Sequence, residues 1–388
     1  MISKMEQVFC DKFENSTNIK KFFSPGRVNL IGEHIDYNGG NVFPCALSIG
    51  TYGIFRKRED SKVLCYSMNF EELGVIEFDL NNFSFDKKDS WVNYVKGVIW
   101  AFGEKYNLIN SGFDFLCYGN IPNGAGLSSS ASLELLVSKI LIDEYNFNVD
   151  MVEASQISQM AENEFIGVNC GIMDQFAIAM GKKDYATLLN TNTLEYKYIP
   201  VKLDGYKIVI ANTNKERKLS ESKYNERREE CERALKFIQT KKDVKNIAEL
   251  TEEEFEAIKD CIEDEVCLKR ASHVVYENER TKKAVELLQN DNLIAFGKIL
   301  NESHSSLKNL YEVTGIELDT LVEMSQKQEG VLGSRMTGAG FGGCTISIVK
   351  DDWIENFTKV VGEEYTKKIG YSPSFYIVEI GNGTMKLN

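Results

Sequence analysis

The stretch of sequence that decides the fold is Ile121-Pro-Asn-Gly-Ala-Gly-Leu-Ser-Ser-Ser-Ala-Ser-Leu-Glu134, in which glycines and serines run directly into a helical pattern. Apolar residues at helical spacing continue from Leu133 to Leu141, and residues 113–118 before the loop have the aromatic, partly alternating pattern of a strand. A strand, a glycine loop and a helix N-terminus together form an anion site, because the backbone approaches the ligand closely and unpaired N–H groups and the helix dipole point at it. The loop is therefore predicted to bind a polyphosphate, and a serine hydroxyl within it would suit a magnesium ion.

An ordinary helix start is the alternative explanation of the three serines, because serine caps helices well. Capping needs no close approach by a ligand, however, so it does not explain the Gly-Ala-Gly that precedes the serines. We therefore favour the phosphate site.

The composition is that of an ordinary globular protein without a positive charge field. The chain has 388 residues, enough for two domains with hydrophobic cores, and 43% of the residues are hydrophobic and 27% charged. The formal net charge of −13 argues against a general binder of nucleic acid or of anionic membranes, since both need a positive field. No segment reaches the length of a membrane span. We expect neither nucleic acid nor membrane among the partners.

The nine cysteines and three histidines carry no metal or redox signature. The cysteines are scattered and form no Cys-x-x-Cys pair, so the sequence signals neither a zinc site nor a redox dithiol. Residues 1–10 lack the apolar core of a signal peptide. We therefore expect a cytoplasmic protein with reduced thiols.

Helix and strand patterns are mixed along the whole chain, which predicts an α+β fold rather than regular βαβ alternation. Residues 205–211 have the pattern of a buried strand that opens a second unit, so the predicted domains are 1–205 and 206–388. A strand expected at 375–380 would fit either sheet. Further strands are expected near 26–31, 50–56, 63–68, 113–118 and 344–349, and helices near 91–106, 131–145, 151–166 and within 220–306.

A second informative segment is Ser24-Pro-Gly-Arg-Val-Asn-Leu-Ile-Gly-Glu-His-Ile-Asp-Tyr-Asn-Gly-Gly40. Between glycines and among apolar side chains it places four polar residues, Arg27, Glu33, His34 and Asp36. Because a sugar needs many placed hydrogen-bond donors and acceptors, polar groups that emerge from such a segment suit a polyhydroxylated ligand. An ordinary surface loop with Asx turns is the alternative.

A third segment, Cys170-Gly-Ile-Met-Asp-Gln-Phe176, places Asp174 among apolar neighbours. An aspartate soon after a glycine is usually a cap or turn residue. A carboxylate buried beside a cation, however, becomes a base or an orienting group. Upstream, Glu162 lies on the expected helix 151–166, where solvent exposure is the default expectation.

The fourth segment, Met336-Thr-Gly-Ala-Gly-Phe-Gly-Gly-Cys344, formally matches the dinucleotide pattern G-x-G-x-x-G. We reject a Rossmann interpretation, because a strand follows the glycines here, whereas the fingerprint requires a strand before them and a helix after. The glycines instead allow one backbone to approach another loop or a phosphate closely. The chain also lacks G-x-x-x-x-G-K-[ST] and the protein-kinase motifs H-R-D and D-F-G, so it is neither a P-loop enzyme nor a protein kinase.

Three of these segments together resemble the galactokinases of the GHMP small-molecule kinase family. Gly26–Asn38 is similar to the galactokinase signature, Pro122–Ser132 to the family's phosphate loop, and Gly338–Gly343 to its third, glycine-rich motif. The resemblance extends from Phe23 to Gly381. It implies two α+β domains, with a mixed sheet in the N-terminal domain, a ferredoxin-like C-terminal domain and the active site in the cleft between them.

The activity that the resemblance implies is ATP-dependent phosphorylation of α-D-galactose at O1, the first step of galactose metabolism, which yields galactose 1-phosphate and ADP with Mg²⁺ as cofactor. It also implies a monomer whose partners are galactose and ATP. By motif match, the nucleotide phosphates would be bound by Gly124, Ala125, Gly126, Leu127, Ser128, Ser129 and Ser130, and magnesium by Ser130 and Glu162. The sugar pocket would be formed by Glu33, His34, Asp36, Gly171, Asp174 and Tyr224, and the adenine would lie near Ser67, Trp91 and Tyr94. By spacing alone, the last two aromatic residues fit the core of a helix equally well.

Two residues would perform the chemistry. Phosphoryl transfer needs in-line positioning and neutralisation of charge more than covalent help. Asp174 is the candidate that either accepts or only orients the proton of the sugar O1. Arg27 is expected to keep Asp174 ionised and to stabilise charge on the transferring group.

Two other functions stay open at this point. A kinase for N-acetylgalactosamine or another hexose needs room for a larger substituent near Cys170–Asp174, where the sequence resembles the galactose-selective version. A catalytically silent galactose sensor is the second alternative. One such sensor lacks residues of the serine run, which is intact here as Ser128–Ala131.

Overall fold

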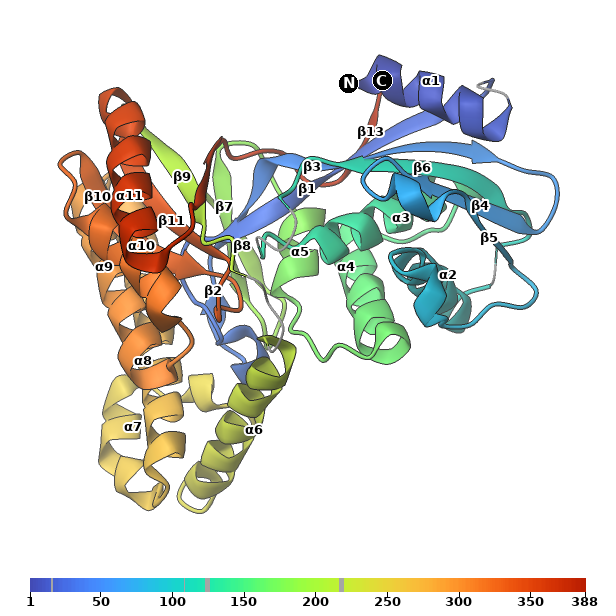
Figure 1. The fold of residues 1–388 in the computed structure, drawn as a ribbon. Coiled ribbons are helices and arrows are strands. Elements are labelled where there is room, and N and C mark those ends of the chain that lie inside the picture. Colours follow the sequence, from blue (N-terminus) through green and yellow to red (C-terminus); the bar gives the residue numbers. More distant parts are fainter. Residues whose placement is uncertain (15–16, 108, 123–125, 216–219) are drawn as a thin grey trace.

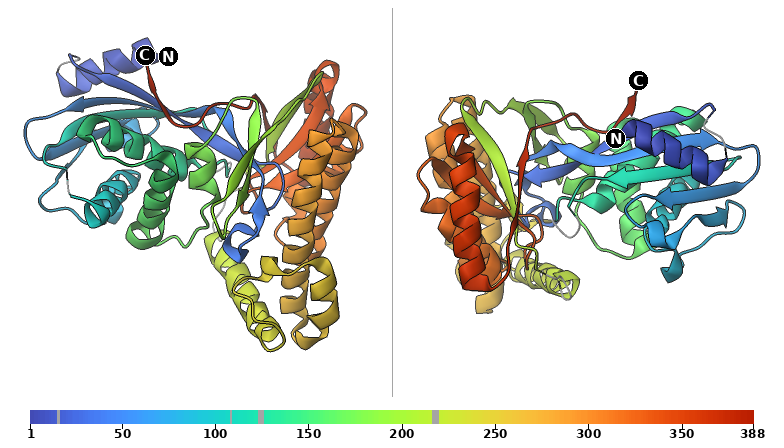
Figure 2. Two further views of the ribbon diagram at one scale, coloured as in Figure 1. Left: turned by 180° about the vertical axis from the view of Figure 1, so that it is seen from behind. Right: turned by 45° about the horizontal axis from the view of Figure 1, so that its top comes forward.

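The computed structural model describes residues 1–14, 17–107, 109–122, 126–215 and 220–388, and it has two lobes, each built on a sheet (Figure 1). Both ends of the chain lie together on the first lobe (Figures 1 and 2). Within the ranges just given, no helix is long and apolar enough to cross a membrane.

The first sheet has six strands in the order β13-β1-β3-β6-β4-β5. It is a mixed sheet, because β4 and β6 pair in parallel while the other pairs are antiparallel. The strands are β1 (Lys20–Asn29), β3 (Pro44–Lys57), β4 (Lys62–Ser67), β5 (Ile76–Asp79), β6 (Phe113–Gly119) and β13 (Met385–Leu387).

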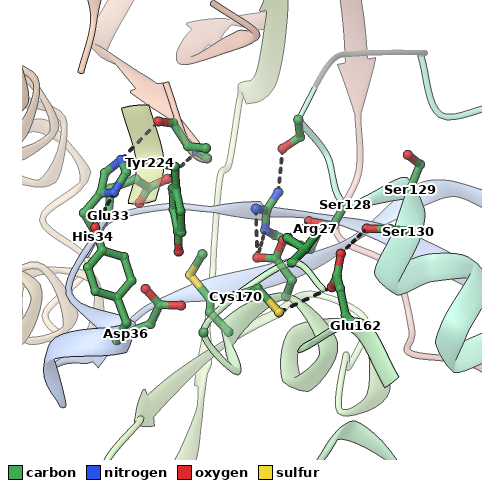
Figure 3. Close-up of a pocket in the computed structure, with 18 of the residues that line it drawn as sticks. Arg27, Glu33, His34, Asp36, Ser128, Ser129, Ser130, Glu162, Cys170 and Tyr224 are labelled. Carbon is green, nitrogen blue, oxygen red and sulfur yellow. Dashed lines mark hydrogen bonds and ion pairs between the residues drawn. The ribbon is translucent and has the colours of Figure 1, made fainter. Parts of the chain in front are cut away.

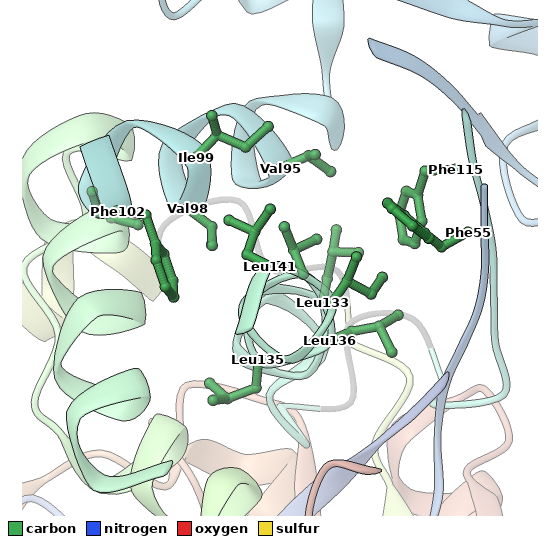
Figure 4. Packing of buried hydrophobic residues seen from close by; sticks show 14 of the residues in the cluster. Phe55, Val95, Val98, Ile99, Phe102, Phe115, Leu133, Leu135, Leu136 and Leu141 are labelled. Atoms are coloured by element: carbon green, nitrogen blue, oxygen red, sulfur yellow. The ribbon is translucent and has the colours of Figure 1, made fainter. Parts of the chain in front are cut away.

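Helix α3 (Ser129–Tyr145) lies between α2 (Val92–Lys105) and this sheet (Figure 4). Apolar side chains cover most of its circumference, as expected of a helix that is packed on several sides. Leu136 is fully buried against the sheet residue Phe115 in the same hydrophobic cluster. The core of the first lobe therefore holds the helix whose N-terminus carries the serine run.

Helix α1 (Ile2–Phe13), which the sequence patterns did not predict, covers the opposite face of the sheet. Met5 and Phe9 are buried there against Leu116. Because successive residues of a strand point to opposite faces, Leu116 faces α1 whereas its neighbour Phe115 faces α3.

The second sheet has four antiparallel strands in the order β10-β11-β9-β12. Along the chain, the strands and the helices between them follow the β-α-β-β-α-β order of a ferredoxin-like domain, which confirms the predicted fold class. The strands are β9 (Tyr206–Asn212), β10 (Val331–Thr337), β11 (Cys344–Lys350) and β12 (Ser374–Val378).

Helices cover both faces of the second sheet, which explains why β9 is apolar at nearly every position. Ile208 and Ile210 pack in the cluster that includes residues of α8 and α9, whereas Val209 and Ala211 pack against α10 and α11. These helices are α8 (Glu265–Gln289), α9 (Leu293–Ser306), α10 (Gly315–Gln326) and α11 (Ile354–Ile369).

The remaining elements include a three-stranded sheet and a set of helical elements that range from 6 to 20 residues in length. The sheet has the order β2-β7-β8. Its strands are β2 (Asn41–Val42), β7 (Tyr185–Asn190) and β8 (Tyr196–Pro200), and the helices are α4 (Met151–Met160), a π-helical turn (Ala161–Ile166), α5 (Met173–Ala179), α6 (Ser220–Gln239) and α7 (Glu252–Ile258).

The last two strands of the chain belong to different sheets. The strand expected at 375–380 joins the second sheet as β12, while β13 returns to pair with β1 in the first. One hydrophobic cluster also contains both Val28 of β1 and Ile346 of β11, so the two lobes share buried surface. The division into 1–205 and 206–388 stays a prediction.

Candidate active site

A pocket of about 430 Å³ lies where six parts of the chain meet. They are the segment Ser24–Gly40, the serine run (Ser128–Ser130), the π-helical turn, α5, α6 and the third glycine motif (Gly338–Gly343). Figure 3 shows Arg27 in the middle of the pocket, with Glu33 and His34 on one side and Ser129, Ser130 and Glu162 on the other. Thirteen of the predicted site residues line it: Arg27, Glu33, His34, Asp36, Tyr94, Gly126, Ser128, Ser129, Ser130, Glu162, Gly171, Asp174 and Tyr224.

One end of the pocket is formed by the N-terminus of α3. Gly126 and Ser128 both have a positive φ, of 72° and 62°, and the helix begins at Ser129, whose side chain is exposed. Orphan N–H groups of the first helical turn and the helix dipole therefore face the pocket, as a phosphate site requires. The predicted residues Gly124 and Ala125 lie outside the described residues.

Arg27 and Asp174 form the centre of the pocket. Nε and Nη2 of Arg27 lie 2.9 and 2.8 Å from Oδ1 of Asp174, and Nη1 donates to the backbone oxygen of Gly126 at 2.7 Å. The hydroxyl of Ser128 donates to Oδ2 of Asp174 at 2.5 Å. Only 4% of the Arg27 side chain is exposed, compared with 32% of Asp174. The cation is thus buried behind the carboxylate, which faces the pocket.

A group of buried polar side chains lies behind the serine run. Oγ of Ser130 donates to Oε1 of Glu162 at 3.1 Å, and the amide of Gln175 donates to Oε2 of Glu162 at 2.6 Å and to Glu134 at 3.1 Å. Burial raises the pKa of Glu162, and the nearby charge of Asp174 raises it further. Burial also raises the pKa of Glu134 well above its usual value. Glu162 is therefore buried at the pocket wall, contrary to the default of an exposed helical residue.

Glu33 lies at the opposite end, buried in a set of fixed donors. Its carboxylate forms an ion pair with Arg335 at 3.0 Å and accepts hydrogen bonds from Thr337 Oγ1 at 3.0 Å and from the backbone N–H of Gly338 at 2.8 Å. Asn29 also donates to it. Burial raises the pKa of Glu33 more strongly than the charge of Arg335 lowers it.

His34 is held next to Glu33 with a positive φ of 63°. Its Nε2 lies 3.2 Å from the backbone oxygen of Ala339, and its Nδ1 lies 2.8 Å from the hydroxyl of Tyr37. Burial lowers the pKa of His34 to about 3, so the ring is neutral. Tyr224 of α6 packs against it, with ring centroids 5.8 Å apart.

Asp36 and Gly171 are in direct contact. A Cβ atom on Gly171 would lie 1.8 Å from Oδ2 of Asp36, so this position tolerates no side chain unless the carboxylate moves. Burial, followed by the charge of Asp174, raises the pKa of Asp36 to about 6. Glycine at position 171 thus leaves free the space that the carboxylate of Asp36 occupies.

The third glycine motif packs against both of the other motifs. Gly338 has a φ of 82°, and a Cβ there would lie 3.0 Å from the backbone oxygen of Gly126. Its own N–H binds Glu33, and Ala339 accepts from His34. The expectation that these glycines allow close backbone approach is confirmed, and the strand that follows them is β11.

The remaining predicted residues lie deeper in the structure. Leu127 and Trp91 are buried in the hydrophobic core, and Trp91 contacts the ring of Phe115. Ser67 is buried at the end of β4, where its hydroxyl accepts from the N–H of Asn69 at 3.1 Å. Of the three residues expected near adenine, Tyr94 is the one that lines the described pocket.

Sequence reasoning missed several supporting residues. Gln175 follows Asp174 directly in the Cys170–Phe176 segment, and this position is the signal that could have identified it. Arg335 and Tyr311 carry no local signal, because their partners are Glu33 and Tyr37, about 300 and 270 residues away along the chain.

Three signatures of known kinases match the chain. The galactokinase galactose-binding signature matches residues 7–57, the GHMP kinases N terminal domain matches residues 93–182, and the GHMP kinases C terminal domain matches residues 284–365. The first contains the segment Ser24–Gly40, and the second contains the serine run together with Asp174.

Curated relatives are similar over the whole chain. The galactokinase of Clostridium acetobutylicum is 60% identical over 385 residues, which cover 99% of this chain and 98% of the relative. That of Fusobacterium nucleatum is 57% identical over 388 residues and covers all of both chains.

Solved structures agree with these relatives. The crystal structure of Lactococcus lactis galactokinase complexed with galactose matches with a TM-score of 0.96 at 53% identity, over the full length of both chains. Methanococcus jannaschii mevalonate kinase matches with a TM-score of 0.66 at 20% identity, over 94% of this chain and 98% of the other, which shows a shared fold. The fold, the pocket and the signatures together define a GHMP small-molecule kinase. Within that class, the chain belongs to the galactokinase family.

Proposed function

We propose that this pocket transfers the terminal phosphoryl group of ATP to O1 of α-D-galactose, so that galactose 1-phosphate and ADP are formed. The chain is a kinase of galactose that uses ATP as co-substrate, in keeping with its family and with relatives more than 50% identical over their full length. The observation that supports these roles is the position of the Arg27–Asp174 pair. It lies between the N-terminus of α3 and the buried polar side chains that would bind the sugar.

The nucleotide phosphates belong at the N-terminus of α3. Ser128 and Ser129, with the backbone of Gly126, offer neutral donors there, and the helix dipole favours negative charge. The adenine would lie toward Tyr94, which lines the same pocket.

Ser130 and Glu162 are the proposed ligands of Mg²⁺. A hydroxyl and a carboxylate oxygen 3.1 Å apart are the hard donors that Mg²⁺ prefers, and the raised pKa of Glu162 shows a buried carboxyl that a nearby cation would help to ionise. When bound, the metal would neutralise charge on the phosphates. This pair of side chains therefore fits the ion.

Asp174 is placed to receive the O1 hydroxyl of the sugar. Both of its oxygens accept hydrogen bonds, from Arg27 and from Ser128, so the carboxylate is held in a fixed orientation. We therefore favour the orienting role, in which Asp174 aligns the hydroxyl with the phosphorus atom while Arg27 stabilises the transferring charge.

The sugar ring would bind between Asp174 and the residues Glu33, His34, Asp36 and Tyr224. Carboxyl oxygens accept hydrogen bonds from several hydroxyl groups at once, while the aromatic ring of Tyr224 packs on an apolar face. We further propose a cytoplasmic monomer, as the resemblance implies. All nine cysteines lie within the described residues, and each is a free thiol there.

The test is ADP release from magnesium-ATP by the purified protein with galactose, N-acetylgalactosamine, glucose and mannose. We expect turnover with galactose. Turnover with N-acetylgalactosamine alone would move the chain to another sugar specificity. Binding of galactose and ATP without turnover of any sugar would instead identify a sensor.

A further inference from the structure

The hydrogen bonds of His34 continue from the pocket into the protein interior. Nδ1 of His34 lies 2.8 Å from the hydroxyl of Tyr37, which lies 2.9 Å from the hydroxyl of Tyr311. The Tyr311 hydroxyl in turn lies 3.0 Å from Sγ of Cys231. Four polar groups from three distant segments of the chain therefore form one continuous series.

The direction of every proton in this series follows from its first member. The backbone oxygen of Ala339 only accepts, so Nε2 of His34 carries the ring proton. The ring is neutral, with a pKa of about 3, so Nδ1 has no proton and accepts from Tyr37. Each hydroxyl has a single proton, so Tyr311 must donate to Tyr37, and the thiol of Cys231 must donate to Tyr311.

The same residues also hold the rings around His34. The ring of Tyr311 lies 4.8 Å from that of His34, and Tyr311 is fully buried outside the lining of the described pocket. Cys231 stands on α6, seven residues after Tyr224, and hence on nearly the same face of the helix. A non-glycine residue with positive φ, such as His34, keeps that conformation only where its surroundings over-determine it.

We propose that Tyr311 is a positioning residue for sugar binding, which acts through Tyr37 to hold His34 as the neutral, Nε2-protonated ring. This inference rests on the proposed function of the pocket as a galactose site. Tyr311 itself does not touch the sugar. Its removal therefore disturbs the sugar end of the pocket, at Glu33, His34 and Asp36, and leaves the phosphate end, at Gly126–Ser130, unchanged.

The kinetic test compares Tyr311→Phe with Tyr365→Phe. Both tyrosines are fully buried, and the hydroxyl of each forms a hydrogen bond within the protein. Tyr365 lies on α11 in a separate hydrophobic cluster, and its hydroxyl donates to the backbone oxygen of Thr213 at 2.8 Å. Loss of a buried hydrogen-bond partner leaves its former partner unsatisfied. We expect Tyr311→Phe to raise the KM for galactose about tenfold, which corresponds to about 1.4 kcal/mol, with kcat and the KM for ATP within about twofold of wild type.

Tyr365→Phe should lower the melting temperature to a similar extent without changing the KM for galactose. An unchanged galactose KM in Tyr311→Phe, or an equal rise in both variants, would overturn the proposal. Cys231→Ser, which keeps a proton donor at the end of the series, should retain a KM closer to wild type than Cys231→Ala.

A second readout does not depend on activity. The chain has only three histidines, so ¹⁵N-histidine labelling with a His34→Asn variant for assignment isolates the ring of His34 by NMR. We expect an Nε2-protonated ring whose Nδ1 signal moves toward that of an unbonded nitrogen in Tyr37→Phe and, less far, in Tyr311→Phe. A proton on Nδ1 in the wild type would contradict the assigned direction. If the wild-type protein phosphorylated no galactose, the proposed function would fail while this NMR result would still decide the hydrogen-bond series.

Discussion

The two ends of the pocket are built in different ways. The end that we propose for phosphate consists of nearly consecutive residues, Gly126–Ser130, whose donors come largely from the backbone and a helix N-terminus. The end that we propose for the sugar consists of Glu33, His34 and Asp36, whose pKa values are all shifted by burial. Their partners come from distant segments.

This contrast shows how each end obtains its chemistry. A helix N-terminus needs only the local chain to attract an anion, because its donors are the orphan N–H groups of the first turn. Buried carboxylates instead need compensating partners, since a charge without them is costly in a protein interior. Substitutions at the centre should therefore abolish turnover, while those at the sugar end should alter recognition through packing and ionisation.

The largest effect is expected for Asp174→Ala, at the junction of the two ends. We expect kcat to fall about 10²- to 10⁴-fold, because the variant no longer aligns the O1 hydroxyl. ATP affinity, measured by calorimetry, should be retained, because the N–H groups of the first turn of α3 stay in place although Ser128 loses its acceptor. Asp174→Asn separates orientation from proton abstraction: it should retain more activity than the alanine variant if orientation dominates. Near-normal turnover of Asp174→Ala would exclude Asp174 from the chemistry.

A smaller effect is expected for Gly171→Ala at the sugar end. The new methyl group overlaps the carboxylate of Asp36, so this carboxylate must move. Loss of a hydrogen bond to a charged group should raise the KM for galactose about 10- to 100-fold, with the KM for ATP unchanged. Gly119→Ala is the matched control, because a Cβ there makes only ordinary contacts of 3.7 and 3.8 Å. Equal galactose KM values in the two variants would contradict the placement of Asp36.

A pH dependence should distinguish the sugar end further. The pKa of Asp36 is raised to about 6, so this carboxyl becomes protonated and loses acceptor capacity as the pH falls below that value. We expect kcat/KM for galactose to decrease by up to about tenfold per pH unit below pH 6, as for a single proton. Asp36→Asn, although much less active, should lack this acid limb. A limb that persists in Asp36→Asn would assign the titration to another group.

The smallest effect concerns stability near the phosphate end. Burial raises the pKa of Glu134 in the folded protein above the usual value of about 4.5. At a pH above 4.5, the folded protein therefore keeps a proton on Glu134 that the unfolded chain has lost. The stability that this proton supplies is complete below pH 4.5 and is lost as the pH rises toward the folded pKa. Glu134→Gln, which stays neutral, should therefore show a melting temperature that declines less between pH 5 and pH 8. Parallel curves for the two proteins would show that Glu134 is ionised in the fold.

Much of the fold could be predicted from periodicity alone. The helix at 131–145 and the strands at 113–118 and 344–349 were expected where α3, β6 and β11 lie, because each has a clear apolar pattern. Helix α1 was missed, and β13 is only three residues long, too short to show any period. Pairing of β13 with β1 joins residues more than 360 positions apart, which no local pattern reveals.

Within the site, prediction was best for residues that stand in a recognisable motif, even where two motifs are distant along the chain. The serine run and the Arg27–Asp174 pair lie together as expected, and Glu33, His34, Asp36, Gly171 and Tyr224 line the same pocket. The roles of these residues stay predictions. The supporting residues, such as Gln175 and Arg335, act only through contacts that folding creates, so residue type and spacing did not single them out.

The sequence by itself determined the α+β class, the position of the glycine- and serine-rich loop before α3 and the resemblance to galactokinases, because glycine, serine and apolar spacing act over a few residues of chain. Only the tertiary structure decided how the sugar end is charged and which groups hold it. Ionisation depends on burial and on neighbours from distant segments, as for Asp36 beside Gly171 or His34 behind Tyr37 and Tyr311. Those neighbours come together only when the two lobes pack around the pocket.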